Sequence, residues 1–357
     1  MTQALESFDG DVLVLSDTPL LTREVLEGLL AEHRAKGADV TLLTFEPDHP
    51  FPYGRVVRGA NGEVCAIVEE LDATDEQRTI RELNTSIYVF RSEALWSALE
   101  GLDSHNAQGE LYLTDTISQI VEGGGKASAY RSPDPDAPVG INNRAELAWA
   151  MGVLQRRINE RHMLAGATIV DPRTTWIEAD VELEPDVVVH PFTVLRGRTH
   201  LAGGSEIGPH AVAVDAVVGP GAVVGPFCYL RAGTVLDTDA KAGTFVEIKN
   251  SRIGKGTKVP HLSYVGDADV GDGTNIAAGN IMANFPHETG REKQRTKIGR
   301  NVKTGVQNAF IAPVTIGDDA WTAAGSVITE DVPAEALAIA RARQVNKEGY
   351  ARSNRDD

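Results

Sequence analysis

From Ile207 onward, an aliphatic residue followed directly by glycine recurs through the second half of the chain at multiples of about six positions. The eight pairs are Ile207-Gly208, Val218-Gly219, Val224-Gly225, Ile253-Gly254, Val265-Gly266, Val270-Gly271, Ile298-Gly299 and Ile316-Gly317. Val218 and Val224 are six positions apart, and Ile253 and Val265 are twelve apart. Hexapeptide repeats of this kind are the signature of a parallel β-helix, in which one aliphatic side chain fills each inner corner and the glycine turns the chain.

One segment interrupts the repeat. Residues 284–296 are polar and charged and include His, Pro and Gly. Such a break inside a regular solenoid predicts a loop that leaves one coil and returns to it.

The first 145 or so residues alternate apolar strand patterns with helical ones. Asp11–Leu15 is a short apolar run that predicts a buried parallel strand, and Val40–Phe45 predicts the next strand. Between them we expect a helix that Thr22 caps and Gly37 ends. A strand, a helix and a strand in this order predict a right-handed βαβ unit of a doubly wound α/β sheet.

The length and these two patterns predict more than one domain, because 357 residues exceed what a single hydrophobic core usually organises. A helix-period segment rich in Arg, Glu and Leu, residues 144–164, lies between the two patterns. We therefore divide the chain into an α/β domain (1–143), a linker helix (144–166), a β-helix domain (167–345) and a C-terminal tail (346–357).

Composition excludes several kinds of partner. The net charge of −17 argues against nucleic acid and anionic membranes, which clustered Lys and Arg would bind. The two cysteines, Cys65 and Cys228, fall in different domains, so we expect no disulfide framework. No apolar run is long enough to cross a membrane and residues 1–10 do not resemble a signal peptide, so we expect a cytoplasmic protein.

Longer stretches resemble one bacterial enzyme family along almost the whole chain. In the first half they are Leu15–Leu21, Tyr53–Arg55, Ile67–Glu69, Asp72–Arg78, Leu83–Thr85, Asn106–Asp115 and Gly140–Arg144. In the second half they are Phe227–Arg231, Phe245–Asn250, Lys258–Asp267, Asn275–Ile276 and Ala336–Arg341. They resemble the bifunctional N-acetylglucosamine-1-phosphate uridylyltransferase/glucosamine-1-phosphate N-acetyltransferase family, which supplies precursors of peptidoglycan and lipopolysaccharide.

This resemblance implies a fold, substrates and an assembly. The first domain would be a Rossmann-like nucleotidyltransferase domain that joins UTP to N-acetylglucosamine 1-phosphate with Mg²⁺. The second would be a left-handed parallel β-helix that acetylates glucosamine 1-phosphate from acetyl-CoA. The resemblance also implies a homotrimer with acetyl-CoA in the grooves between neighbouring chains.

Asp17 is the first candidate site residue. It follows the carboxyl end of a predicted strand, where open α/β sheets bind ligands, and a carboxylate there can hold Mg²⁺. The resemblance makes Asn142 its partner in metal binding. It also implies contacts with the nucleotide sugar at Ser16, Gly54, Glu69, Asn84 and Asn142.

The N-terminal phosphate-binding segment of the family is not found in this sequence. The family opens with a strand and a Gly-rich loop that ends in Arg and Lys, and Met1 lies after both. Triphosphates need such backbone N–H groups and cations for in-line attack. We therefore expect little or no uridylyltransferase activity, with a true truncation and a misplaced gene start as open alternatives.

For acetyl transfer, the resemblance implies that His261 is the general base. An imidazole suits that task because its unperturbed pKa is near neutrality. Glu247 would orient the imidazole. The implied contacts with the sugar phosphate are Arg231, Lys249, Tyr264 and Asn275.

For acetyl-CoA, the resemblance implies contacts at Ala278, Asn284, Phe285, Val306, Ala324 and Arg341. Here the sequence departs from the family, which has Asn-Tyr-Asp-Gly in place of Asn284-Phe285-Pro286-His287 and Ser in place of Val306. The loop that follows is longer than in the family. We expect Lys293 or Arg291 to take the place of a lysine that contacts phosphate in the family.

Three functions follow from these observations. The leading hypothesis is a glucosamine-1-phosphate N-acetyltransferase. The alternative is a non-catalytic paralogue that binds sugar phosphates or partners an intact relative. The third is an acyltransferase with a different substrate, because of the changed donor loop.

Overall fold

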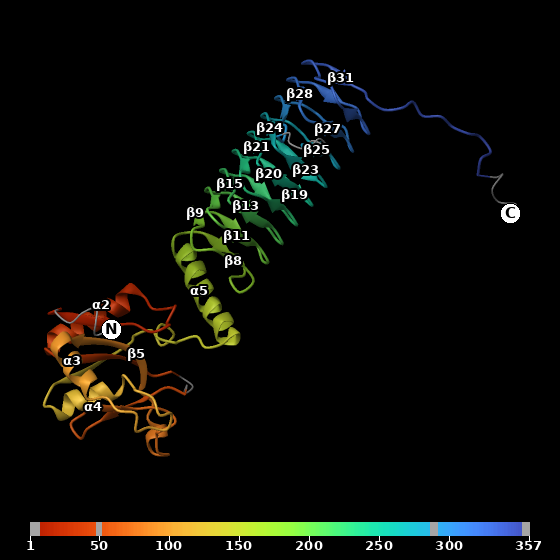
Figure 1. Ribbon diagram of the computed structural model, residues 1–357. Helices are drawn as coiled ribbons and strands as arrows, with labels where there is room; N and C mark the ends of the chain where they lie inside the picture. Colours follow the sequence, from red (N-terminus) through yellow and green to blue (C-terminus); the bar gives the residue numbers. More distant parts are fainter. Residues whose placement is uncertain (1–7, 48–51, 286–291, 352–357) are drawn as a thin grey trace. The chain divides into compact units, whose positions relative to one another are not determined.

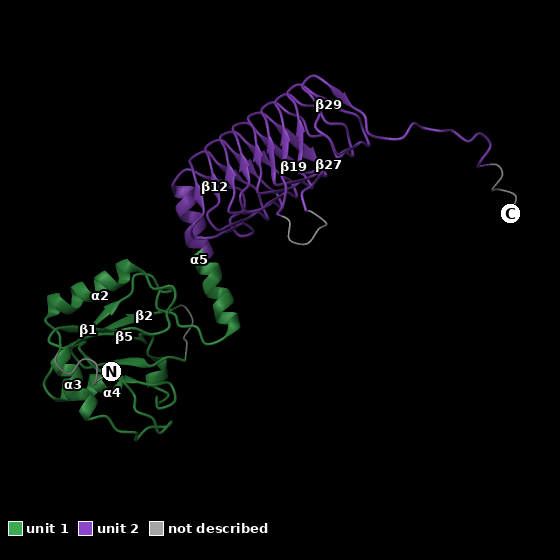
Figure 2. Ribbon diagram, turned by 45° about the horizontal axis from the view of Figure 1, so that its top comes forward, with its two compact units in different colours: residues 1–154 green, residues 155–357 purple. Residues whose placement is uncertain are grey.

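The computed structural model describes residues 8–47, 52–285 and 292–351, and the chain divides into two compact units, residues 1–154 and 155–357 (Figure 2). A helix over residues 144–164 is confirmed as α5 (Arg144–Leu164), and the boundary between the units lies inside it. The division at 143, 166 and 345 stays a prediction.

The first unit is built on a mixed six-stranded sheet (Figure 1). Its strands are β1 (Asp11–Val14), β2 (Val40–Phe45), β3 (Arg55–Arg58), β4 (Val64–Val68), β5 (Leu83–Arg91) and β6 (Ala127–Arg131). The helices are α2 (Arg23–Lys36), the 3₁₀ helix η1 (Gln77–Thr79), α3 (Ser92–Glu100) and α4 (Asp115–Glu122). The strand order is β4-β3-β5-β2-β6, and β1 also pairs with β5.

The helix and the strand expected after Thr22 are confirmed. Thr22 is the N-cap of α2, where its hydroxyl accepts a hydrogen bond from the Val25 amide at 3.5 Å. Gly37 ends the helix with a φ of 57°, a left-handed conformation that glycine adopts without a steric penalty. All of β2 is buried, as its continuous apolar run predicted.

The prediction of a buried parallel strand over residues 11–15 is wrong. β1 pairs antiparallel with β5, with Asp11 opposite Arg91, and Leu13 remains 37% exposed. β5 also pairs antiparallel with β2, so β5 separates β1 from β2 and the two do not form an adjacent parallel pair. The partner of β1 comes from a segment about 80 positions later, which a local pattern does not reveal.

The second unit is a left-handed parallel β-helix, as expected. Sheet B contains β7 (Thr168–Ile169), β10 (Val188–Val189), β13 (Glu206–Ile207), β16 (Val223–Val224), β19 (Lys241–Thr244) and β22 (Lys258–His261). Bridges through Asn275 and Lys303 extend it to β29 (Trp321–Thr322) and β31 (Leu337–Ala338).

Two further sheets complete the prism. Sheet C contains β8 (Trp176–Ile177), β11 (Val194–Arg196), β14 (Val212–Val214), β17 (Tyr229–Leu230), β20 (Glu247–Lys249), β23 (Tyr264–Gly266), β25 (Ile281–Ala283), β27 (Ala309–Ile311) and β30 (Val327–Ile328). Sheet D contains β9 (Glu182–Leu183), β12 (His200–Leu201), β15 (Val217–Val218), β18 (Val235–Leu236), β21 (Arg252–Ile253), β24 (Ala268–Val270), β26 (Thr296–Ile298) and β28 (Val314–Ile316).

The repeat residues build the interior of this prism. The aliphatic residue of each of the eight pairs is at most 3% exposed, and all eight belong to one continuous core. Their burial removes apolar surface from water in every coil, which is the main stabilising contribution to a solenoid. The hexapeptide prediction is therefore confirmed.

The loop expected after residue 284 is confirmed by the register of sheet D. Ala268 pairs with Thr296, 28 positions later, whereas Arg252 pairs with Asp269 only 17 positions later. The extra residues lie between β25 and β26. Pro286, His287 and Arg291 lie outside the described residues.

The edge between sheets B and C, here called the B–C edge, carries a ladder of large exposed side chains in its first coils and smaller or polar residues at the equivalent positions of later coils. In its first part Phe192, His210 and Phe227 stack with ring centroids 4.8 Å apart, and Phe245 continues the stack at 5.4 Å. Leu262 occupies the next position of this exposed ladder. The equivalent left-handed positions of later coils are Gly279, Gln307 and Gly325, so no aromatic ring extends from the edge there.

Candidate active sites

A cavity of about 150 Å³ in the first unit contains every residue predicted to bind the nucleotide sugar or its metal. The lining residues are Ser16, Asp17, Thr18, Pro52, Tyr53, Gly54, Glu69, Asn84, Thr85, Ser86, Pro138, Gly140 and Asn142. They come from five separate parts of the sequence, which the fold of this unit brings together.

Backbone contacts position two of these residues. The Asn84 amide donates to the Gly54 carbonyl at 2.8 Å, which joins β5 to the segment before β3. A Cβ atom added to Gly54 would lie 2.8 Å from the Ile67 side chain, so this position accepts glycine alone without a shift. The Asn84 side chain is buried and donates to the Tyr88 hydroxyl at 2.8 Å.

Glu69 is the acidic residue on the wall of this cavity. Its carboxylate accepts a hydrogen bond from the Thr114 hydroxyl at 3.1 Å. Burial raises the pKa of Glu69 above its ordinary value, because the charged form loses solvation. A carboxyl group at this wall can form hydrogen bonds with the hydroxyl groups of a ligand.

Asp17 and Asn142 fit the binding of one Mg²⁺ ion at the rim. Both are exposed and line the same cavity. The Asn142 amide nitrogen donates to Glu146 at 3.2 Å, and no described residue donates to its carbonyl oxygen. A carboxylate and a carbonyl oxygen suit Mg²⁺, which retains several waters. Over the described residues, no group of three or more His, Cys, Asp or Glu could hold a metal ion.

In the second unit, four predicted residues gather on sheet C. Arg231 pairs with Glu247 at 2.8 Å, and Glu247 lies opposite Tyr264 in the next coil. A Cβ atom added to Gly266 would lie 2.3 Å from the Tyr264 hydroxyl, so the ring covers this glycine. Lys249 lies opposite Gly266, at the end of the same strand as Glu247.

A second lysine joins this cluster from the inserted loop. Lys293 lies beside Lys249, and this contact with a like charge lowers the pKa of Lys249. Lys293 also lies 5.9 Å from the centre of the Phe285 ring. Two adjacent ammonium groups repel each other, and a bound anion would remove that repulsion.

His261 lies at the end of β22, on the B–C edge, and is exposed. Its carbonyl oxygen accepts from the Ser263 hydroxyl at 2.8 Å, which fixes the backbone of the turn. The partner of Glu247 is Arg231, and no hydrogen bond joins Glu247 to His261 among the residues described. The orienting role of Glu247 stays a prediction.

Asn275 lies on a different face from the other predicted sugar-phosphate residues. It bridges Lys258 and Lys303 on sheet B, whereas Glu247 and Tyr264 are on sheet C. A single chain therefore does not gather the whole predicted set on one face.

The predicted acetyl-CoA residues form two groups. Ala278, Val306 and Ala324 follow one another along the open part of the B–C edge, where Gln307 donates to the Ala278 carbonyl at 2.8 Å and Gly325 to the Val306 carbonyl at 2.9 Å. The Arg341 side chain lies near Gly325. Asn284 and Phe285 lie at the other edge of sheet C, after β25.

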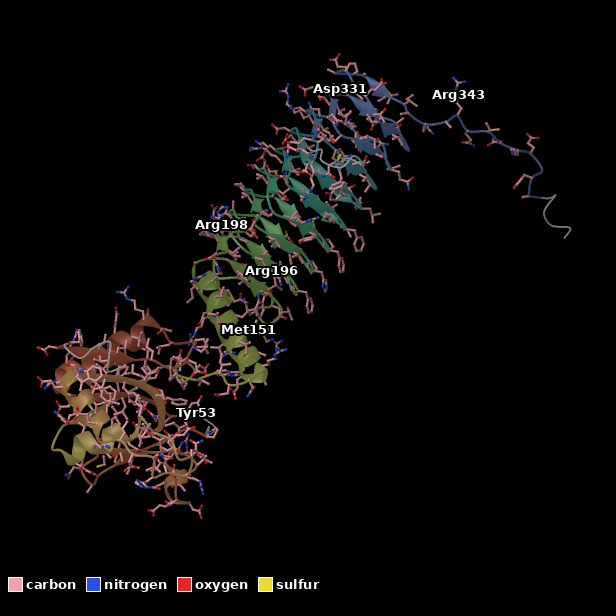
Figure 3. The ribbon with its side chains drawn as sticks, viewed as in Figure 1. Tyr53, Met151, Arg196, Arg198, Asp331 and Arg343 are labelled. Carbon is pink, nitrogen blue, oxygen red and sulfur yellow. The ribbon has the colours of Figure 1, made fainter. Side chains whose placement is uncertain are left out.

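Sequence reasoning did not single out Tyr53. Its hydroxyl accepts from the Gly140 amide at 3.0 Å, and burial raises its pKa (Tyr53 is labelled in Figure 3). The sequence signal that could have identified Tyr53 was its position next to Gly54 in the matched stretch Tyr53–Arg55. Sequence reasoning also missed Asp267, a buried carboxylate beside Lys249 and the final residue of the matched stretch Lys258–Asp267.

Comparisons with known proteins identify relatives of this chain. The nucleotidyl transferase family profile matches residues 2–149. The bifunctional protein GlmU of Streptomyces coelicolor is 50% identical over 365 residues, which cover 97% of this chain and 75% of the relative. The bifunctional protein GlmU of Mycobacterium bovis is 48% identical over 98% of this chain and 74% of the relative.

Among solved structures, the UDP-N-acetylglucosamine O-acyltransferase LpxA of Moraxella catarrhalis is 19% identical with a TM-score of 0.35, over 52% of this chain and 77% of that one. In the described part of the chain, helices long and apolar enough to span a membrane are absent.

Proposed function

The chain belongs to the family of bifunctional GlmU proteins, and from this we propose that it transfers the acetyl group of acetyl-CoA to the amine of glucosamine 1-phosphate. The product is N-acetylglucosamine 1-phosphate. The observation that carries this proposal is the cationic cluster of Arg231, Lys249 and Lys293 beside Tyr264, on a chain of net charge −17. Clustered cations on such an acidic chain favour a phosphate ligand.

The reaction assigns one role to each group. Arg231 and Lys249 would hold the sugar phosphate, and His261 would take a proton from the amine as its nitrogen attacks the thioester carbonyl. The new C–N bond forms as the C–S bond breaks, and CoA leaves as the thiol after taking up a proton. The open B–C edge at Ala278, Val306 and Ala324 would receive the CoA arm.

For the first unit, we propose a nucleotide-sugar site in the cavity around Asn84 and Glu69. Asp17 and Asn142 would hold Mg²⁺, which would neutralise phosphate charge when bound. Gly54 would allow the sugar to approach the backbone closely. We keep the cytoplasm as the predicted location, in agreement with the sparse cysteines.

We also propose that the protein is a homotrimer. Two features support this: the predicted substrate residues lie on two faces of one prism, and the exposed ladder of the B–C edge leaves Phe227 48% and Phe245 58% accessible. Contiguous exposed apolar side chains typically mark interfaces. A neighbouring chain would both cover the ladder and complete the sites.

Phe227→Asp tests the trimer. We expect the variant to behave in solution as a single chain, because a carboxylate placed in an apolar interface loses its hydration. Light scattering after size exclusion measures the mass. Val217→Asp, at a position 41% exposed on sheet D, is the matched control and should keep the mass of three chains. A Phe227→Asp trimer would contradict this interface.

Release of free thiol from acetyl-CoA on addition of glucosamine 1-phosphate tests the function. We expect thiol release that depends on both substrates and gives N-acetylglucosamine 1-phosphate by mass spectrometry. No release by a folded trimer, together with binding of the sugar phosphate, would favour the non-catalytic paralogue. Release from a longer acyl-CoA but not from acetyl-CoA would favour the third hypothesis.

A further inference from the structure

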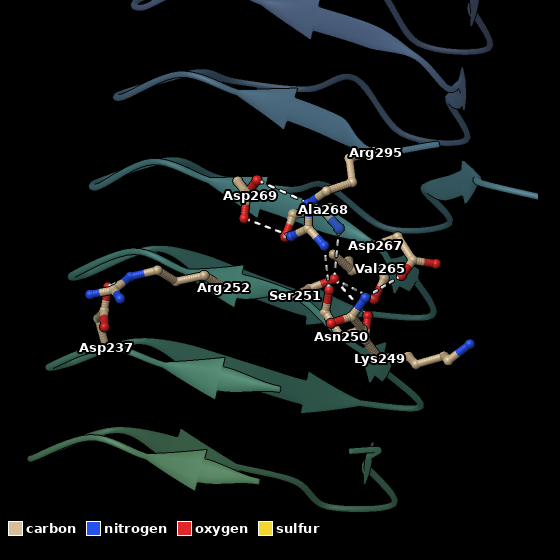
Figure 4. A network of polar contacts seen from close by, with 10 residues as sticks. All are labelled: Asp237, Lys249, Asn250, Ser251, Arg252, Val265, Asp267, Ala268, Asp269 and Arg295. Atoms are coloured by element: carbon tan, nitrogen blue, oxygen red, sulfur yellow. Dashed lines mark hydrogen bonds and ion pairs between the residues drawn. The ribbon is translucent and has the colours of Figure 1, made fainter. Parts of the chain in front are cut away.

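The inserted loop is attached at both ends to one short turn of the preceding coil. The turn consists of Asp267, between β23 and β24, and the first two residues of β24, Ala268 and Asp269 (Figure 4). At one end Asn284 donates its amide N–H to Asp267, and at the other Arg295 forms two hydrogen bonds with Asp269, at 2.7 and 3.1 Å. A backbone hydrogen bond joins the two ends of the loop: the main-chain amide of Gln294 donates to the main-chain carbonyl of Asn284 at 3.2 Å.

Asp267 is buried at the centre of this arrangement. It is 4% exposed, and its two carboxylate oxygens accept from two different amide side chains. One is Asn250 at 2.5 Å and the other is Asn284, and each lies 17 positions away along the chain. The three residues therefore occupy the same corner in successive coils.

The two amide side chains belong to the proposed sites of two different substrates, the sugar phosphate and acetyl-CoA. Asn250 directly follows Lys249, a proposed phosphate ligand, and the Asp267 amide donates to the Lys249 carbonyl at 3.0 Å. Asn284 is a proposed acetyl-CoA contact. Asp267 thus links the backbone of the acceptor site to a side chain of the donor site.

An ionised carboxylate only accepts hydrogen bonds, so it binds the nitrogen side of both amides. The side-chain nitrogen of Asn284 is thereby turned toward the interior, and no described residue donates to its side-chain oxygen Oδ1. We propose that Asp267 is a positioning residue that fixes Asn284 as a hydrogen-bond acceptor for an N–H group of a substrate. This inference rests on the proposed acetyl transfer.

Two substrate groups could supply that N–H: the amine of the sugar phosphate and an amide of the pantetheine arm. Their shared chemistry is an N–H donor that approaches the end of β25. Without Asp267, the Asn284 amide could rotate by half a turn and present its own N–H groups instead.

A double-mutant cycle of Asp267→Asn and Asn284→Ala tests the inference on the full chain. We expect each single variant to raise the KM of the same substrate about tenfold, with kcat changed less than about threefold, and the double variant to match Asn284→Ala. A rise in the KM of glucosamine 1-phosphate identifies the amine, and a rise in that of acetyl-CoA identifies the pantetheine amide. Asp237→Asn, which removes a carboxylate paired with Arg252, is the control and should leave both KM values unchanged.

Additive effects in the double variant would show that Asp267 supports the fold only and would overturn the inference, as would unchanged KM values in Asp267→Asn. If the wild-type chain releases no thiol, the proposed function fails, but the same cycle is measurable as dissociation constants of CoA and of glucosamine 1-phosphate by calorimetry. Additive changes there, or no binding of either compound, would overturn the positioning role as well.

Discussion

His261→Gln should lower kcat for acetyl transfer by about a hundredfold to ten-thousandfold, because the amine then loses the group that accepts its proton. Glutamine keeps a polar side chain of similar reach but cannot take up a proton near neutral pH. The KM of glucosamine 1-phosphate should change little, since the proposed phosphate contacts are Arg231 and Lys249. Initial rates of thiol release at varied substrate concentration measure both constants.

His200→Gln is the matched control for this experiment. His200 lies on sheet D, where its imidazole is 3.3 Å from Glu184, and it has no part in the proposed chemistry. Its variant should turn over as the wild type does. If His261→Gln retained more than about a tenth of kcat, another group would have to be the base, since general-base catalysis is typically worth at least about a hundredfold.

The second large effect concerns the stability of the first unit. Glu82 is buried, accepts from the Thr44 hydroxyl at 2.8 Å and receives two hydrogen bonds from Arg58, at 2.7 and 2.8 Å. Arg58→Ala would leave a buried carboxylate without its cation, which costs about 3–5 kcal/mol of unfolding free energy. Urea denaturation followed by circular dichroism measures the change in the first unit's transition.

Lowering the pH should reduce the difference in unfolding free energy between the wild type and Arg58→Ala. Burial alone would raise the pKa of Glu82, but the hydrogen bonds from Arg58 and Thr44 outweigh this effect and hold the folded-state pKa below its ordinary value. The ion pair therefore contributes its full stability above the unfolded-state pKa and loses it as the pH falls through the folded-state pKa. The gap in unfolding free energy between wild type and Arg58→Ala should shrink as the pH falls, because protonation of Glu82 in the variant removes its buried, unpaired charge.

Arg23→Ala is the control for this pair. Arg23 contacts Glu27 at 2.7 Å on an exposed face of α2, and such pairs contribute about 0.3–0.5 kcal/mol. If Arg58→Ala lost an equally small amount of unfolding free energy, solvent and not Arg58 would be the group that compensates the Glu82 charge.

The solenoid could be predicted from the sequence because its core is local. Each repeat places one aliphatic side chain in a corner, so Ile207, Val224 and Ile316 reveal their burial by spacing alone. The helix cap at Thr22 and the left-handed Gly37 are equally local, since both depend on neighbours within a few positions. The gathering of Asp17, Glu69 and Asn84 in one cavity followed from the family resemblance.

What could not be predicted depends on distant partners. The direction of β1 is set by β5, and the Arg231 side chain that engages Glu247 comes from the preceding coil. The proposed role of Asp267 depends on the positions of Asn250 and Asn284 in the coils on either side. A one-dimensional pattern shows that a coil exists but not which side chains face each other across coils.

The stacking of coils also has a consequence for how the molecule comes apart. Each coil of a solenoid contacts only its neighbours, so its stability is approximately a sum of local and nearest-neighbour contributions, and fraying begins at the ends. The coils that hold Arg231, Lys249, His261 and Asn284 have coils on both sides. Amide hydrogen exchange should therefore be slower around the proposed acetyltransferase residues than toward β31, and the coils at that end would unfold first, whereas Ile158 of α5 packs against the core at the β7 end.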